Sequence, residues 1–299
     1  MEVSIIIVNY NTKELTNNCI NSILSWTHEI DYEIILVDNA STDGSKEFFE
    51  NRNDIVYIYN DQNLGFGNAN NVGYERSEGK YILLLNSDTY LLNNAIYEFW
   101  KFAESCEVKI ACIGCVLYDK NLNVNASEGQ FLTIKRVIKS SIKRYNLNAD
   151  KIINKKNIYK NTVFPKKVEA IIGADLFIKR QIIDSYGLFD TNIFMYCEEI
   201  DLQKRYLEAG YVSVLIDTPK IVHLEGQSSN NYSARRNILF TNGVFYFLKK
   251  HSNNFNYLLF RMIYLLLKLP ILFNPNYLFK DRFSILFNLL KTNKNKINV

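Results

Sequence analysis

Val3-Ser-Ile-Ile-Ile-Val8 is a short, β-branched and almost continuous apolar run near the start of the chain. A run of this kind is typical of a strand that is buried on both faces of a parallel sheet. The same signal recurs at residues 33–37, 55–59 and 80–85. We therefore expect four strands in the first 90 residues, each with an interior position in one sheet.

Helices are expected between these strands. The first runs from Thr12, a residue type that caps helices, to about Ser25. The second starts near Thr42, and the third runs from about Gly67 to Ser77. Strands that alternate with helices predict βαβ units, so we expect an α/β, Rossmann-like fold with a mostly parallel sheet flanked by helices.

Polar residues follow three of the predicted strands, at Asn9-Tyr-Asn11, at 38–44 and at Asn86-Ser-Asp88. Open α/β sheets bind ligands beyond the carboxyl ends of their strands. Asp38 can accept a hydrogen bond from a ligand, such as the N3–H of a pyrimidine base, whereas Asp43 is better explained as a helix cap. Asp88 suits a hard divalent cation that also holds phosphates, although a loop tripeptide of this composition is common.

Composition excludes several classes of protein. The chain has 299 residues, of which 47% are hydrophobic and 22% charged, so it is neither a disordered chain, a collagen-like fibre nor a small disulfide scaffold. Five scattered cysteines favour a reducing compartment. The early strand signal leaves no basic and apolar regions for a signal peptide, so we expect a cytoplasmic protein.

Positive charge is concentrated between Lys135 and Lys167, which hold eleven Lys or Arg residues and one acid, Asp150. One interpretation is a solvated insertion that is rich in lysine. The other is a surface that faces anionic lipid or an acceptor carrying phosphate. The sequence leaves both open.

The C-terminal tail, residues 255–290, is dense in Leu, Ile, Phe and Tyr. Arg261 and Lys268 interrupt it, so no uncharged apolar run of about 20 residues exists and we do not expect it to span a bilayer. A helix over Tyr257–Leu269 either lies on a membrane or packs against the catalytic domain or a second subunit. If the helix packs against a second subunit, the protein would be a homodimer.

Several motifs, taken together and in order, resemble family 2 glycosyltransferases of the GT-A fold. They are Val3–Tyr10, Val37–Ser45, Asn63–Gly67, Leu85–Asp88, Gly173-Ala174, Gly187–Asp190, Glu198–Asp201 and His223–Gly226. The likeness covers roughly residues 1–250 and is closer to bacterial rhamnosyltransferase-like enzymes that build surface polysaccharides. It implies a nucleotide-diphosphate sugar donor and Mg²⁺ or Mn²⁺ as cofactor.

The resemblance also implies roles for residues around the donor. Asp38 would read the base, and Asp88 matches the last acid of the family's Asp-x-Asp metal motif, with Asn86 replacing the first acid. His223 would complete the metal shell or contact the diphosphate. Further substrate-binding candidates are Asn9, Tyr10, Asn11, Gly65, Gly67, Gly173, Ala174, Arg235 and Arg236. The two glycines at 65 and 67 also fit a plain loop, and the two arginines also fit a solvated helix start.

The acidic motif at Glu198-Glu199 and Asp201 resembles the family's Glu-Asp-x-Asp, whose second position holds the base of inverting members. The corresponding residue is Glu199, one methylene longer than the usual Asp, so Asp201 and Glu198 stay catalytic candidates as well. The motif opens a helix predicted to end near Gly210. Acids in a first helical turn also fit simple interaction with the helix dipole.

We divide the chain into a GT-A domain at 1–250 and a C-terminal helical segment at 251–299. Residues 1–117 form the nucleotide-sugar half of the domain, and 118–250 the acceptor and catalytic half. The expected reaction is inverting, metal-dependent transfer from dTDP-rhamnose or a UDP-hexose to a glycan or lipid-linked glycan at the inner face of the cytoplasmic membrane. No nucleic acid partner is expected.

Two other functions stay open. A nucleotidyltransferase would also use a strand-end carboxylate and a metal, but the loop after the first strand lacks the glycines and cations of a phosphate-binding loop. A non-catalytic glycosyltransferase-like partner protein is favoured by the departures at Asn86 and Glu199.

Overall fold

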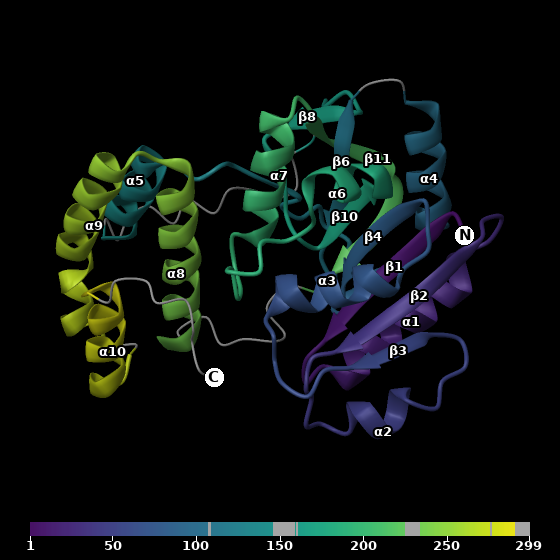
Figure 1. Ribbon diagram of the computed structural model, residues 1–299, viewed down its shortest axis with the longest axis horizontal. Coiled ribbons are helices and arrows are strands. Elements are labelled where there is room, and N and C mark those ends of the chain that lie inside the picture. The colour runs from purple at the N-terminus through teal and green to yellow at the C-terminus, as the bar shows by residue number, and fades with distance from the viewer. Residues whose placement is uncertain (107–108, 146–158, 160, 225–233, 276, 291–299) are drawn as a thin grey trace.

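The computed structural model describes residues 1–106, 109–145, 159, 161–224, 234–275 and 277–290. Figure 1 shows two parts: a sheet covered by helices, and a group of helices beside it. The chain passes from the sheet to the helices and back, because α5 (Ile134–Tyr145) lies among the C-terminal helices.

The four predicted strands form the parallel part of the sheet. They are β1 (Val3–Asn9), β2 (Tyr32–Asp38), β3 (Val56–Tyr59) and β4 (Tyr81–Asn86), in the order β3-β2-β1-β4. The apolar residues of β1 and β4 are buried, which explains why their sequences are apolar without alternation. The parallel α/β arrangement is confirmed, and it aligns Asn9, Asp38 and Asn86 at one edge.

The rest of the nine-stranded sheet is mixed. Its strands are β5 (Thr89–Leu91), β6 (Ile110–Tyr118), β8 (Lys166–Val168), β10 (Asp175–Lys179) and β11 (Val212–His223). β10 runs antiparallel between β4 and β6, and β11 is parallel to β6. A small second sheet pairs β7 (Glu128–Gly129) with β9 (Ala170–Ile171). Because β11 also pairs with β5, its last residue, His223, lies opposite Thr89.

Helices cover both faces of the sheet. They are α1 (Lys13–Trp26), α2 (Ser45–Phe49), α3 (Phe66–Arg76), α4 (Ala95–Ser105), α6 (Arg180–Tyr186) and α7 (Glu198–Glu208). Side chains of α1, α2 and α4 share one core, and those of α3, α6 and α7 share the other. The predicted α2 starts later than expected, because Asp43 accepts hydrogen bonds from the backbone N–H groups of Lys13 and Ser45 at 2.9 and 3.2 Å.

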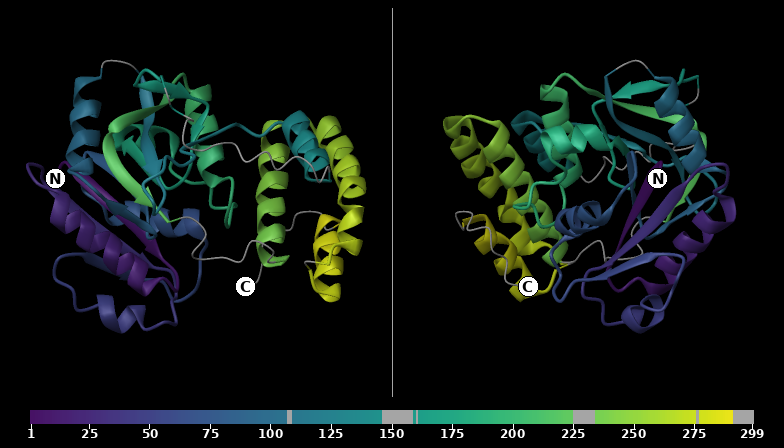
Figure 2. Two further views of the ribbon diagram at one scale, coloured as in Figure 1. Left: turned by 180° about the vertical axis from the view of Figure 1, so that it is seen from behind. Right: turned by 45° about the vertical axis from the view of Figure 1, so that its right-hand side comes forward.

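The second part contains α5, α8 (Ala234–His251), α9 (Asn254–Lys268), a 3₁₀ turn η2 (Leu269–Phe273) and α10 (Phe279–Leu290). Their shared core includes Val137, Phe245, Phe260 and Leu289. Figure 2 shows these helices beside the sheet from two further directions. A helical C-terminal appendage is confirmed; the packing groups α8 with it, whereas the sequence-based division placed α8 in the catalytic half.

One helical segment in the described residues, Asn254–Phe273, has the length and composition of a membrane span, with a mean hydropathy of 1.5. The sequence analysis did not expect this, because Arg261 and Lys268 interrupt the run. Only 28% of its most apolar window is buried. The segment packs on the bundle through Tyr257, Phe260 and Tyr264.

Candidate active site

The polar loops after β1, β2 and β4 are joined by hydrogen bonds into one edge. Asn9 Nδ2 donates to Ser41 Oγ at 3.0 Å, and the backbone N–H of Asn11 donates to the same oxygen at 2.9 Å. Thr12 Oγ1 lies 3.2 Å from Ser87 Oγ, in the loop after β4. The structure thus brings together the three segments that the sequence analysis selected.

Asp38 is completely buried at this edge, and three donors surround its carboxylate. They are the Ser41 backbone N–H at 2.8 Å, the Tyr57 hydroxyl at 3.1 Å and Asn9 Nδ2 at 3.4 Å. Burial, and then the charge of Asp38, raise the pKa of Tyr57, which keeps this hydroxyl a donor. Tyr57 was not selected from the sequence. Tyr10 is the exposed member of the edge, with 39% of its surface accessible.

The Asn63–Gly67 segment is held by Asn39, which the sequence analysis missed. Asn39 Nδ2 donates to Asn63 Oδ1 at 2.9 Å, and Asn39 Oδ1 accepts from the Leu64 backbone at 3.0 Å. Gly65 has φ +84°, and a Cβ there would lie 2.1 Å from the Phe194 carbonyl oxygen. Close packing against the segment before α7 therefore explains Gly65 without a donor contact.

Asp88 and His223 lie close together at the same edge of the sheet, Asp88 between β4 and β5 and His223 at the end of β11. The pairing of β5 with β11 brings His223 Nε2 to 3.2 Å from Asp88 Oδ1. The Leu224 backbone N–H also donates to the Asp88 carbonyl at 2.9 Å. Both side chains are mostly buried, with 13% of Asp88 and 11% of His223 accessible. The two residues expected at a metal are therefore neighbours.

The donor set at this point fits a hard divalent cation. Asn86, two residues before Asp88, has a buried Oδ1 that accepts no hydrogen bond within the described part of the chain, so this amide oxygen has an unused lone pair. Nowhere in the described part of the chain do three or more His, Cys, Asp or Glu side chains form a cluster able to hold a metal. A cation here would need oxygens from water and phosphate as its other ligands, as Mg²⁺ commonly has.

Gly173-Ala174 connects this edge to the acidic motif. The Asn86 backbone N–H donates to the Ala174 carbonyl at 3.0 Å. A Cβ on Gly173 would lie 3.4 Å from the Cβ of Glu199. Glu199 therefore lies close to the Gly173-Ala174 turn, which contacts the end of β4. Because residue 173 is glycine, no side chain there separates Glu199 from the turn.

Glu198 and Glu199 are adjacent carboxyl groups at the start of α7, and Glu198 is buried while Glu199 is half-buried. Burial raises the pKa of Glu199. Burial, and then the charge of Glu199, raise the pKa of Glu198 well above its usual value. Glu198 Oε2 has no hydrogen-bond partner among the described residues. The two adjacent carboxyl groups therefore hold a proton to a higher pH than an exposed glutamate does.

Asp201 occupies a different environment from the one expected of a catalytic residue. Its side chain is completely buried, with Arg205 Nε at 3.0 Å and both Lys250 Nζ and His251 Nε2 at 2.9 Å. Burial alone would raise the pKa of Asp201, but hydrogen bonds from His251 and Lys250 outweigh it and lower that pKa. Asp201 thus joins α7 to the end of α8, and cationic side chains enclose its carboxylate.

Asp190 extends the same junction. It accepts hydrogen bonds from Lys250 Nζ at 2.7 Å and from the Tyr246 hydroxyl at 3.0 Å. Burial raises its pKa, but the hydrogen bond from Lys250 and others lower it to about 2. α8 also approaches closely at Gly243, where a Cβ would lie 2.3 Å from the Tyr196 carbonyl oxygen.

Arg235 and Arg236 lie in the first turn of α8. The helix-start alternative therefore describes their position better than a loop over the donor. Glu225 and Gly226 of the last motif lie outside the described residues, as do 146–158 and 160 of the basic stretch.

Asp175 is a further buried carboxyl group that the sequence analysis missed. Its Oδ2 accepts from the Cys115 backbone N–H at 2.6 Å, and Oδ1 has no partner in the described structure. Burial raises the pKa of Asp175 to about 7, while the charge of His223 acts in the opposite direction. An acid directly before the apolar run 176–178 was the available signal.

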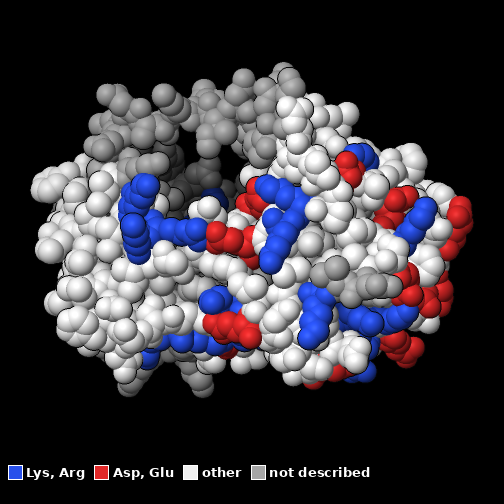
Figure 3. Space-filling model, turned by 90° about the horizontal axis from the view of Figure 1, so that it is seen from above, with Lys and Arg blue, Asp and Glu red and all other residues white. Residues whose placement is uncertain are grey.

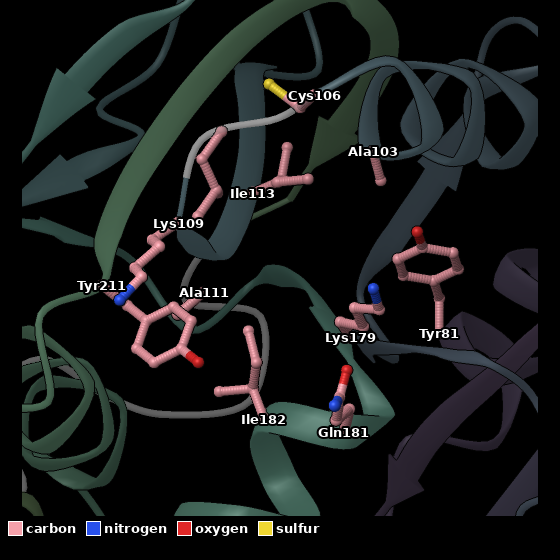
Figure 4. Close-up of a pocket in the computed structure, with 11 residues that line it drawn as sticks. Tyr81, Ala103, Cys106, Lys109, Ala111, Ile113, Lys179, Gln181, Ile182 and Tyr211 are labelled. Atoms are coloured by element: carbon pink, nitrogen blue, oxygen red, sulfur yellow. The ribbon is translucent and has the colours of Figure 1, made fainter.

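A separate cavity of about 250 Å³ lies at the opposite end of the sheet. Figure 4 shows Tyr81, Lys109, Lys179 and Tyr211 around it. Tyr81 begins β4, whereas Asn86 ends it. The cavity is therefore distinct from the edge that holds Asp88.

Comparison with known proteins finds sequence and structural similarity to glycosyltransferases. The chain is 28% identical over 226 residues to the poly(ribitol-phosphate) beta-glucosyltransferase of Bacillus spizizenii. The match covers 73% of this chain and 31% of that protein, so the chain spans less than a third of the relative's length.

Two solved structures share the fold. The mannosyltransferase PcManGT of Pyrobaculum calidifontis, in complex with GDP-Man and Mn²⁺, has a TM-score of 0.58 at 14% identity, over 95% of this chain and 73% of that one. S. aureus TarS 1–349 in complex with UDP has a TM-score of 0.51 at 16% identity, over 97% and 71%. These likenesses show the GT-A fold.

The family model described as "Glycosyl transferase family 2" matches residues 4–180. This range contains β1 to β4, the Asp88 edge and the Gly173-Ala174 turn. Because the match covers more than half of the chain, the protein belongs to glycosyl transferase family 2.

Proposed function

We propose that the protein is an inverting, metal-dependent glycosyltransferase that uses a nucleotide-diphosphate sugar as donor. The observation that carries this proposal is the proximity of two groups at one sheet edge. Asp88 and His223 lie 3.2 Å apart, and the Gly173-Ala174 turn connects the end of β4 to Glu199. A metal-binding pair and a base are the two groups that such a transfer requires.

The nucleotide would bind beside the edge formed by Asn9, Asn11 and Asp38. Asp38 is completely buried and accepts from three donors, so a base would reach a remaining lone-pair site of its carboxylate only after a covering side chain such as Asn9 or Tyr57 moves. The structural neighbours described above are complexes with UDP and with GDP-Man. For this chain we propose dTDP-rhamnose or a UDP-hexose.

Asp88, His223 and Asn86 Oδ1 would hold Mg²⁺ or Mn²⁺. His223 Nε2 would offer its lone pair to the cation in place of its present contact with Asp88. When bound, the cation offsets negative charge on the departing diphosphate. Because Asn86 is neutral where the family motif has an acid, the protein supplies one carboxylate fewer, and the donor's own phosphates contribute more of the binding.

Glu199 would accept the proton of the acceptor hydroxyl. Its raised pKa makes it a stronger base than an exposed glutamate. The acceptor oxygen attacks the anomeric carbon as the bond to the diphosphate breaks. One displacement on the opposite face inverts the configuration, and no covalent enzyme intermediate is needed.

We propose a glycan or lipid-linked glycan as acceptor, in the synthesis of a bacterial surface polysaccharide. The support is the family membership together with the name of the Bacillus relative, which acts on a poly(ribitol-phosphate). The enzyme would then work in the cytoplasm, bound peripherally to the inner face of the cytoplasmic membrane. The basic stretch and the apolar C-terminal helices support this location.

A screen of nucleotide sugars by calorimetry, with and without Mn²⁺, tests the donor site. We expect one nucleotide class to bind at least tenfold more tightly when Mn²⁺ is present. A chain that binds no nucleotide sugar under either condition would instead be a non-catalytic partner protein. The anomeric configuration of the product, measured by NMR, tests inversion separately.

A further inference from the structure

The C-terminal helices expose an unusually continuous apolar surface. On α9 and η2 the exposed side chains are Phe255, Leu258, Leu259, Met262, Leu266, Leu269 and Phe273. On α10 and just before it they are Leu278, Phe279, Phe283, Phe287 and Leu290. We call these residues the outer face. Their spacing of three or four residues places each set on one side of its helix.

The opposite sides of the same helices are also apolar, but they are buried. Tyr257, Phe260 and Tyr264 of α9 and Leu289 of α10 pack in the core that contains Phe245 of α8. A helix that is apolar all round normally lies inside a protein or in lipid. Here the described residues pack against only one side of α9 and α10, the side that faces the core with Phe245. Figure 1 places both helices at the end of the molecule remote from the sheet.

The two cations that interrupt the apolar run are turned away from the outer face. Arg261 donates to the Leu289 carbonyl at 2.7 Å, and the Lys268 ammonium lies 5.2 Å from the centre of the Tyr264 ring. Lys268 is only 8% exposed. The outer face of α9 therefore carries no charged side chain, although the helix itself contains Arg261 and Lys268.

Charge on the surrounding helices decides which partner fits. Residues 234–290 contain eight Lys or Arg and one acid, Asp281, and α5 adds five cations and no acid. In Figure 3 most of the red side chains lie over the sheet and its junction with the helices, and the outer end is white and blue. A second copy of this bundle would bring like charges together, whereas an anionic bilayer offers the opposite charge and an apolar interior.

We propose that the outer face is a lipid-binding surface that lies in the headgroup region of an anionic membrane. Exposed Lys249 and Lys280 would contact phosphates while Phe273 and Phe283 enter the acyl boundary. The proposal names the surface that would bring the proposed enzyme to a lipid-linked acceptor, and for that use it rests on the proposed function.

Co-sedimentation of the full-length chain with vesicles tests this surface. We expect binding to phosphatidylglycerol vesicles at low salt, weaker binding at high salt and little binding to phosphatidylcholine. The double variant Met262→Glu and Phe287→Glu should reduce binding at least tenfold, because both side chains are more than 60% exposed and belong to the outer face. The matched control is Leu122→Glu with Val56→Glu, which changes two exposed apolar residues of the catalytic part by the same charge.

Thermal unfolding should be the same for both double variants and the original chain, since all four side chains are exposed. The proposal is overturned if full-length protein stays in the supernatant with anionic vesicles, or if both double variants lose binding equally. A stable dimer that only the Met262→Glu and Phe287→Glu variant dissociates would assign the face to a second copy instead. Release of nucleoside diphosphate from a soluble donor tests the catalytic proposal separately.

Discussion

Glu199 is the residue on which the proposed chemistry depends, and replacing it with glutamine tests that role. Glu199→Gln removes the proton acceptor while keeping size and shape, so we expect kcat to fall by roughly 10²-fold or more. Binding of the donor, measured by calorimetry, should change little, because Glu199 lies beside Gly173 and not at Asp38. A variant that keeps normal kcat would show that another group takes the proton.

The pH dependence of the same residue follows from its burial. Because the pKa of Glu199 is raised, the base is ionised above that raised value and protonated below it. We therefore expect kcat/KM to fall as the pH decreases, with a midpoint above the ordinary glutamate value of about 4.3. A pH–rate profile that stays flat down to pH 4 would contradict the assignment.

At the scale of elements, Asp201 binds α7 to α8. Asp201→Asn removes the charge that Lys250, Arg205 and His251 share, so we expect a loss of about 2 kcal/mol in the free energy of unfolding. This is less than for a fully buried pair, because 29% of the Lys250 side chain is exposed. Urea unfolding measures it, with Lys204→Met as control, since Lys204 pairs with the exposed Glu208 and its ammonium lies 5.8 Å from the Phe131 ring, without a buried carboxylate.

Comparing Glu199→Gln with Asp201→Asn also shows which of the two acids is the base. If Asp201→Asn lowered kcat more than Glu199→Gln while leaving stability unchanged, Asp201 would be the base. We expect the opposite order, because Asp201 is enclosed by cations and Glu199 lies near the turn at the end of β4.

Local patterns predicted the elements that local sequence specifies. The apolar runs of β1, β2 and β4 and the helix over 198–208 are as expected, because burial on both sides of a sheet imposes a recognisable composition. β3 forms where predicted, but it lies at the edge of the sheet and is only partly buried, so the expected interior position was wrong for this strand. The strand β10 was missed, since five residues between a turn and a helix carry little periodicity. The pairing of Asp201 with Lys250 was not predictable either, because it depends on where α8 packs.

In the candidate site, too, residue types could be predicted from the sequence, but the contacts between distant segments could not. Asp88, His223 and Glu199 could be selected by type and resemblance, but their proximity depends on β5 pairing with β11 and on the Gly173-Ala174 turn. Asn39 and Tyr57 act through neighbouring segments and have no distinctive pattern of their own. Contacts between distant segments are the part that a single sequence does not reveal.

At the scale of the whole molecule, the helical part and the catalytic part are joined next to the proposed base. Lys250 of α8 contacts Asp201, two residues after Glu199, and also Asp190 in the segment before α7. A membrane bound to the outer face would therefore hold a bundle that contacts the helix carrying the base. The proposed membrane-binding helices are thus linked through Lys250 and Asp201 to the helix that carries Glu199.

Release of nucleoside diphosphate from a panel of nucleotide sugars tests metal-dependent transfer most directly. It should be measured with and without Mn²⁺, for the original chain and for Asp88→Ala, with circular dichroism to verify the fold. We expect at least one donor to be cleaved only when Mn²⁺ is present, and Asp88→Ala to lose this activity while remaining folded, because it lacks the carboxylate that lies 3.2 Å from His223 Nε2. Near-normal turnover by Asp88→Ala with Mn²⁺, or release that does not depend on metal, would contradict the proposed mechanism.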